Sequence, residues 1–75
     1  MTLGERLRGL RKAHGWTLKI VAHAIIRSVS FLSDVERGRV YPSVDTLFEL
    51  ARFYDVSLSE LVEGVEQPAR DDFLV

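Results

Sequence analysis

Residues 17–36 read TLKIVAHAIIRSVSFLSDVE and carry the signals of two short helices with a turn between them. Thr17 can cap the first helix. The apolar face of this first helix consists of residues at helical spacing: Val21, Ala22 and Ile25. Ser28 can cap the second helix, which should end at Gly38 because glycine suits the position just past a helix. The stretch therefore predicts a helix, a turn and a second helix.

The second of these helices leaves several side chains outside any core. Leu32 and Val35 are three residues apart, so they share one face and can be buried together. Four other residues face elsewhere: Val29, Ser30, Ser33 and Asp34. They are candidates for contact with a partner, and the alternative is an ordinary solvated helix face.

The flanking sequence predicts three more helices. Leucines at helical spacing run through residues 1–13, and residues 44–54 form the clearest amphipathic pattern of the chain. A last short helix ends before Gly64. No stretch alternates with period two for long enough to demand a strand. The chain is therefore predicted to be all-α, with a five-helix domain over residues 1–64 and a tail over residues 65–75.

Composition describes one small domain with a modest core. Of the 75 residues 47% are hydrophobic, so disorder of the whole chain is not expected. The absence of cysteine excludes disulfides and thiolate metal sites and suits a reducing cytosol. No apolar run reaches the length of about 18 residues typical of a membrane span, and no signal peptide opens the sequence.

The charge of the chain is divided between its two parts. The net charge is −1, which taken alone argues against a nucleic-acid partner. Residues 1–42, however, hold eight Lys or Arg against three carboxylates, a net charge of +5. Residues 43–75 hold two Lys or Arg against eight carboxylates, a net charge of −6. The first part therefore favours contact with an anion, unless the segregation arose by chance.

Residues 17–36 resemble the helix-turn-helix of the lambda-repressor-like family, also called the xenobiotic-response-element family. The resemblance covers about residues 3–64. Matching residues outside the motif or at its end are Arg11, Glu36, Gly38, Pro42, Leu47, Ala51 and Leu61. The segments FLSDVERGR and LVEGVE look most like the short repressors of the deinococcal DNA-damage response and related phage-type regulators. The resemblance implies a DNA-binding transcriptional regulator, in most cases a repressor, at the nucleoid in the cytoplasm of a bacterial host.

In this family the second helix of the motif lies in the DNA major groove, and its N-terminal residues reach base edges. Carried over by position, the base-facing residues are Val29, Ser30 and Asp34, with Ser33 nearby. Contacts to backbone phosphates are implied for Thr17, Leu18, Lys19, Ser28, Arg37 and Arg39, and less strongly for Arg27 and Lys12. The resemblance also implies a partly buried ion pair between Arg11 and Glu36, with a structural role.

Two residues of the turn depart from the family pattern. The turn usually holds a glycine with positive φ, but this sequence has Ile26, a β-branched residue for which positive φ is costly. The next position is usually apolar, and here it is Arg27. The turn has a different backbone, or it carries about 1–3 kcal/mol of strain, or the sequence is a variant of the natural one.

Catalysis is not expected. A triad of serine, histidine and aspartate can be written on paper, but so small a helical domain offers little concave space for one. The sequence predicts no enzyme, no cofactor and no metal site, with His14 and His23 at the surface and Trp16 at the edge of the core. The competing interpretation is a protein-interaction module of the same fold, such as an antitoxin or a coactivator-like adaptor. The basic part of the chain favours double-stranded DNA.

A homodimer is expected because one such domain reads only a short half-site, and family members bind pseudo-palindromic operators in pairs. The apolar residues after Ser57 exceed what one short helix needs to bury. The predicted two-fold contact consists of Leu58, Leu61, Val62 and Val65, with the apolar tip of the tail, Phe73–Val75, as further apolar surface.

Overall fold

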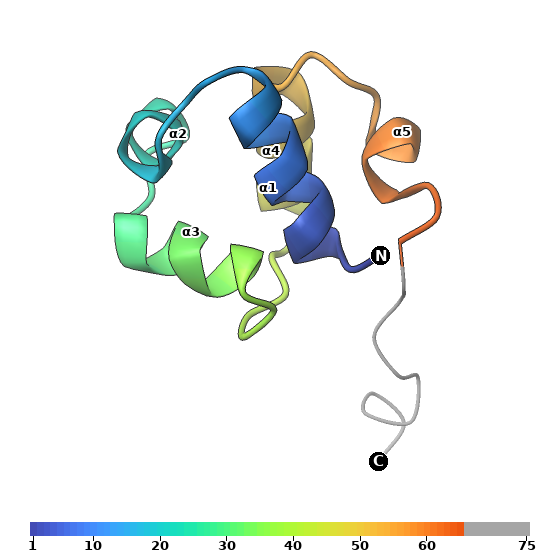
Figure 1. Cartoon of the computed structure of the whole chain (residues 1–75), viewed down its shortest axis with the longest axis horizontal. Coiled ribbons are helices and arrows are strands. Elements are labelled where there is room, and N and C mark those ends of the chain that lie inside the picture. The colour runs from blue at the N-terminus through green and yellow to red at the C-terminus, as the bar shows by residue number, and fades with distance from the viewer. Residues whose placement is uncertain (66–75) are drawn as a thin grey trace.

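The computed structural model describes residues 1–65, and these form five helices. The helices are α1 Leu3–Ala13, α2 Leu18–Ala24, α3 Val29–Glu36, α4 Val44–Phe53 and α5 Leu58–Val62. In Figure 1, α2 and α3 lie on one side of α1, α5 lies on the other, and α4 passes behind α1. The predicted all-α, five-helix fold is confirmed. Of the predicted tail, only Val65 belongs to the described residues, so Phe73–Val75 lie outside them.

Each helix begins at a serine or threonine whose hydroxyl accepts a backbone N–H of the first turn. The five capping residues are Thr2, Thr17, Ser28, Ser43 and Ser57. Each cap satisfies an amide that has no acceptor within its own helix. In α1 and α5 a glutamate three residues later also accepts the N–H of the capping residue. Hydroxyl caps therefore determine where all five helices start.

The ends of α1, α2, α3 and α4 share one backbone geometry. One residue after each helix has positive φ. Its amide and the amide of the next residue both donate hydrogen bonds to carbonyl oxygens in the last turn of the helix. After α3 this residue is Gly38, with the Gly38 amide 3.1 Å from the Val35 oxygen and the Arg39 amide 2.8 Å from the Asp34 oxygen. The corresponding residues after the other three helices are Gly15, Ile26 and Asp55.

The hydrophobic core lies between all five helices. It is built from thirteen buried residues: Leu3, Leu7, Val21, Ala22, Ile25, Leu32, Val35, Leu47, Leu50, Ala51, Tyr54, Leu61 and Val65. Burial raises the pKa of the Tyr54 hydroxyl. At the edge of the core Trp16 is half-buried, with its ring 4.2 Å from that of His14 and 4.6 Å from that of Phe53. Trp16 closes the core, as predicted.

Gly4 allows α1 to approach the end of α3 closely. A Cβ at this position would lie 2.7 Å from the carbonyl oxygen of Val35 and 2.7 Å from the carbonyl carbon of Glu36. Real Cβ atoms do not come this close to backbone, so any side chain here would push the two helices apart. Nothing in the sequence pattern singled out Gly4, and Gly9 of the same helix has no close neighbour.

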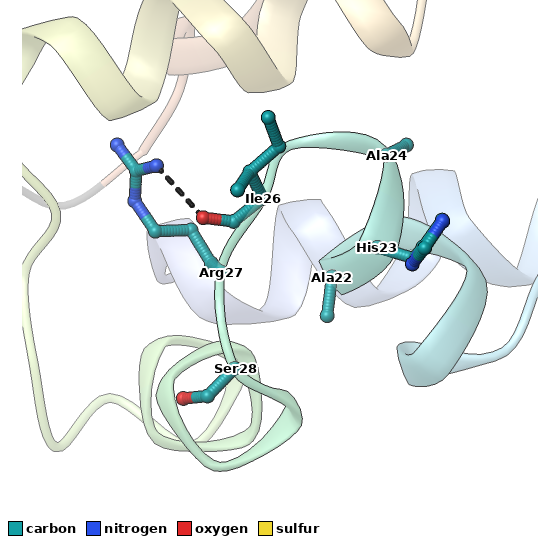
Figure 2. A pocket seen from close by; sticks show the side chains of 6 residues that line it. All are labelled: Ala22, His23, Ala24, Ile26, Arg27 and Ser28. Carbon is teal, nitrogen blue, oxygen red and sulfur yellow. Dashed lines mark hydrogen bonds between the residues drawn. The ribbon is translucent and has the colours of Figure 1, made fainter.

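The turn between α2 and α3 keeps the backbone of a glycine turn without the glycine. Ile26 has φ 56°, its amide lies 3.2 Å from the His23 oxygen, and the Arg27 amide lies 2.9 Å from the Ala22 oxygen. The idea of a different backbone is therefore wrong. Ile26 gains little from this position, because its side chain is 84% exposed (Figure 2). The turn carries the conformational strain expected of a β-branched residue at positive φ.

Replacing Ile26 with glycine should raise the free energy of unfolding or leave it unchanged. The substitution removes about 1–2 kcal/mol of left-handed strain. It costs about 0.4–1 kcal/mol because glycine gives the unfolded chain more freedom. Almost no burial is lost, since the side chain is exposed. Thermal and urea unfolding followed by circular dichroism measure the difference.

The matched control is Gly15→Ala, at the equivalent position after α1, where φ is 73°. This change introduces the same strain, so it should destabilise the domain by about 1 kcal/mol. Ile26→Ala keeps a Cβ at positive φ, so it should not show the increase in the free energy of unfolding expected for Ile26→Gly. A loss of 1 kcal/mol or more in Ile26→Gly would show that the isoleucine side chain contributes packing that outweighs the strain.

Candidate nucleic-acid interface

The solvent-facing side of α3 carries four small side chains, which we call the recognition face: Val29, Ser30, Ser33 and Asp34. Leu32 and Val35 are buried on the opposite side, with 3% and 2% of their surface exposed. Val29 and Ser30 are exposed, whereas Ser33 and Asp34 are half-buried on the two flanks. The structure therefore brings together on one face all four residues predicted to face bases, two of them exposed and two half-buried.

The beginnings of α2 and α3 are fixed by their caps. The Thr17 hydroxyl accepts the Ile20 amide at 3.1 Å, and the Ser28 hydroxyl accepts the Phe31 amide at 3.0 Å. Leu18 and Lys19 occupy the first turn of α2, where amides have no acceptor within the helix. Each capping hydroxyl retains a proton that it can donate outward.

The residues after α3 present two exposed guanidinium groups. Arg37 is the last residue of the helical path and Arg39 follows Gly38, whose positive φ reverses the chain direction. Arg39 lies beside the recognition face, with its guanidinium 3.8 Å from the Asp34 carboxylate. This ion pair is long and exposed, so it leaves Arg39 available to a stronger anion.

Arg27 is exposed, but its guanidinium also makes contacts within the subunit. Its guanidinium donates to the Glu49 carboxylate at 2.8 Å and to the Thr46 hydroxyl at 3.4 Å, both on α4. It also donates to the backbone oxygens of Ile25 and Ile26, each at 3.1 Å. Figure 2 shows the guanidinium turned back onto the carbonyl of Ile26. Arg27 thus ties the strained turn to α4, and its contact with a DNA phosphate stays a prediction.

Arg11 and Glu36 form a bidentate ion pair between α1 and the last residue of α3. The Arg11 Nε lies 2.7 Å from Oε2 of Glu36, and Nη2 lies 2.9 Å from Oε1. Hydrogen bonding to Glu36 raises the pKa of the Arg11 guanidinium. The remaining Nη1 donates to the Trp16 carbonyl at 3.0 Å. The Arg11 side chain therefore connects α1, the loop before α2 and α3, the helix that carries the recognition face.

The predicted dimer residues are partly used inside the subunit. Leu61 has no exposed surface and Val65 has 8%, so neither can offer a contact to a second copy. The prediction is wrong for these two residues because Leu61 of α5 and Val65, which follows that helix, are both buried in the core of the subunit. Leu58 and Val62 are only half-buried. The helix α4, which contacts α5, carries two exposed apolar side chains, Val44 and Phe48.

The described residues show no metal-binding cluster of His, Cys, Asp or Glu. Among the same residues no helix is both long and apolar enough to cross a membrane. Every buried side-chain nitrogen or oxygen in residues 1–65 has a hydrogen-bond partner.

Comparison with known proteins identifies the family of this chain. Residues 2–63 match the family model described as a helix-turn-helix domain. The chain is 52% identical over 66 residues to the HTH-type transcriptional regulator DdrOP3 of Deinococcus deserti, covering 88% of this chain and 51% of that protein. It is 36% identical over 62 residues to the immunity repressor of Bacillus phage phi105, covering 83% of this chain and 43% of that protein.

Solved structures share the arrangement of the helices. The restriction-modification controller protein C.AhdI of Aeromonas hydrophila superposes with a TM-score of 0.75 at 34% identity, covering 79% of this chain and 89% of that one. The DNA-binding domain of the P22 c2 repressor gives a TM-score of 0.81 over 92% of both chains, and at 24% identity it shows the fold alone.

The chain spans about half the length of the deinococcal relative and 43% of the phage repressor. The resemblance to deinococcal and phage-type regulators is confirmed by these matches. With 62 of its residues under one family model, the chain belongs to the helix-turn-helix domain family.

Proposed function

We propose that this chain is the DNA-reading part of a transcriptional regulator, a repressor, that binds a pseudo-palindromic operator as a dimer. The observation that carries the proposal is the recognition face, an uncovered row of small side chains on α3. The Arg11–Glu36 ion pair holds the end of this helix, and Arg37 and Arg39 follow it directly. A helix of this kind fits the major groove, which is about 12 Å wide.

The recognition face can read bases by several weak contacts. The Val29 methyl groups suit a thymine methyl, Ser30 can donate or accept, and Asp34 can accept from the amino group of cytosine. None of the four side chains is an Arg, Asn or Gln, so strong bidentate contacts are absent from this face. The shape and deformability of the operator should therefore contribute to its recognition.

The dimer is supported by the need to read two half-sites about 34 Å apart. With Leu61 and Val65 buried, the surface that remains for a second copy is formed by Val44, Phe48, Leu58 and Val62. Val44 and Phe48 stand one helical turn apart and are 62% and 48% exposed. Two-fold pairing of this surface would bury them and leave α3 of each subunit free.

Replacing Ser30 and Asp34 with alanine should change which operator is preferred. Base contacts carry sequence information, whereas phosphate contacts supply most non-specific binding. Affinity for random duplex should therefore stay nearly constant, or rise slightly because Asp34 repels phosphates. Selection from a random duplex library, followed by fluorescence anisotropy on the selected operator, measures both quantities.

The matched control replaces Ser59 and Asp45, exposed residues of α5 and α4, with alanine, and should keep the original preference. An unchanged preference in the Ser30/Asp34 variant would remove the recognition face from base reading. If the unchanged protein binds no duplex more tightly than random DNA at moderate salt, the repressor proposal fails. The protein-interaction module then takes its place.

Arg37→Ala and Arg39→Ala should weaken binding by a similar factor on every sequence. Phosphate contacts release counterions, so each phosphate lost lowers the slope of log affinity against log salt by about 0.9. Titrations of the selected operator and of random duplex over a range of salt give the slopes. Slopes equal to that of the unchanged protein in both variants would contradict these two assignments.

Phe48→Glu should weaken self-association and specific affinity without altering the preferred half-site. In a two-fold contact the substitution places one carboxylate from each subunit in an apolar interface, and both lose their hydration. Sedimentation of the free protein and the stoichiometry on the operator read the outcome. Ile20→Glu, on the 47% exposed Ile20 of α2, is the control for sedimentation and should leave it unchanged. Unaltered sedimentation and stoichiometry in Phe48→Glu would place the dimer contact elsewhere.

A further inference from the structure

A polar hollow of about 190 Å³ opens where α1, α2 and the end of α3 meet. Its lining residues are Arg8, Arg11, Leu18, Ser33, Glu36 and Arg37. Three of them are arginines: Arg8 and Arg11 of α1, and Arg37, the residue directly after α3. Nothing in the sequence pattern drew attention to Arg8, which is an exposed residue in the middle of α1.

The charge of the hollow is positive. Glu36 is the only acidic residue that lines it, and both of its carboxylate oxygens accept hydrogen bonds from Arg11. Arg8 and Arg37 have no carboxylate within 4.0 Å in the described part of the chain. Two guanidinium groups without anionic partners therefore line one small space, beside the hydroxyl of Ser33.

The position of the hollow relative to the recognition face decides what it can bind. Ser33 and Asp34 lie on opposite flanks of that face, since successive residues of a helix are turned by about 100°. Arg39 stands on the Asp34 flank, and the hollow opens on the Ser33 flank. A helix in the major groove has one sugar–phosphate strand along each flank.

We infer that this hollow holds one backbone phosphate of the operator, bound jointly by Arg8 and Arg37 with Ser33 as a hydroxyl donor. The inference rests on the proposed function and adds a residue of α1 to the DNA contacts. Guanidinium groups suit the task because they donate paired hydrogen bonds to phosphate oxygens. The Arg11–Glu36 pair forms the rigid side of the hollow and fixes its distance from the recognition face.

The first experiment compares Arg8→Gln with Arg52→Gln, which removes the same charge from an exposed residue of α4 outside the hollow. Arg8→Gln should weaken binding to the operator and to random duplex by the same factor, and Arg52→Gln should change neither. Both variants should keep the melting temperature, because neither arginine has a partner in the described chain. Equal affinities of the two variants on an operator that the unchanged protein binds would overturn the inference and leave the proposed function standing.

The second experiment tests whether Arg8 and Arg37 share a phosphate. The double variant Arg8→Gln/Arg37→Gln should lower the salt slope by about 0.9 per subunit, the value for one phosphate. Arg8→Gln or Arg37→Gln alone leaves the other arginine on the shared phosphate and should lower the slope by clearly less than that amount. A loss equal to two phosphates in the Arg8/Arg37 variant would show separate contacts and overturn the shared site.

A free anion is the other source of the same chemistry. Titration with inorganic phosphate in place of duplex, followed by calorimetry, separates the two. Weak phosphate binding with Arg8-dependent duplex binding supports the inference. Phosphate binding that depends on Arg8, together with duplex binding that does not, would assign the hollow to a free anion and overturn it.

Discussion

The contact between α1 and the last turn of α3 sets the angle of the recognition helix. Arg11 donates two hydrogen bonds, of 2.7 and 2.9 Å, to the Glu36 carboxylate. Gly4 allows the backbones of the two helices to pack closely, with no side chain between them. An ion pair of this kind adds little net stability, but losing one partner strands a partly buried charge at a cost of about 3–5 kcal/mol. The pair therefore serves mainly to define one arrangement of the two helices.

Local chemistry made the helix ends predictable from sequence. Ser28 and Gly38 bracket α3 because a hydroxyl satisfies the first amides and a glycine accepts positive φ, and neither effect needs the rest of the fold. The same reasoning identified Ile26 as the residue at odds with its turn. The residues of the recognition face could be named because the spacing of Leu32 and Val35 leaves them no place in the core.

Properties that depend on several helices could not be predicted in this way. The pattern of α5 marks Leu61 as apolar, but it does not say whether the subunit or a second copy covers it. Arg27 is a surface charge in the sequence, and only the fold brings it within reach of Glu49 on α4. Arg8 gains its neighbours from α2 and α3, so no segment of the sequence contains the hollow.

Gly4 has a consequence for genetic tests of the proposed function. A mutation that enlarges this residue leaves every proposed DNA-contacting side chain intact, yet it levers α1 away from the Val35–Glu36 backbone and tilts α3. The resulting protein would share the phenotype of a recognition-face mutant while remaining folded around its other helices. Suppressors of such a mutation would then arise in the last turn of α3, where a displaced backbone can be accommodated, and not among the residues that read the operator.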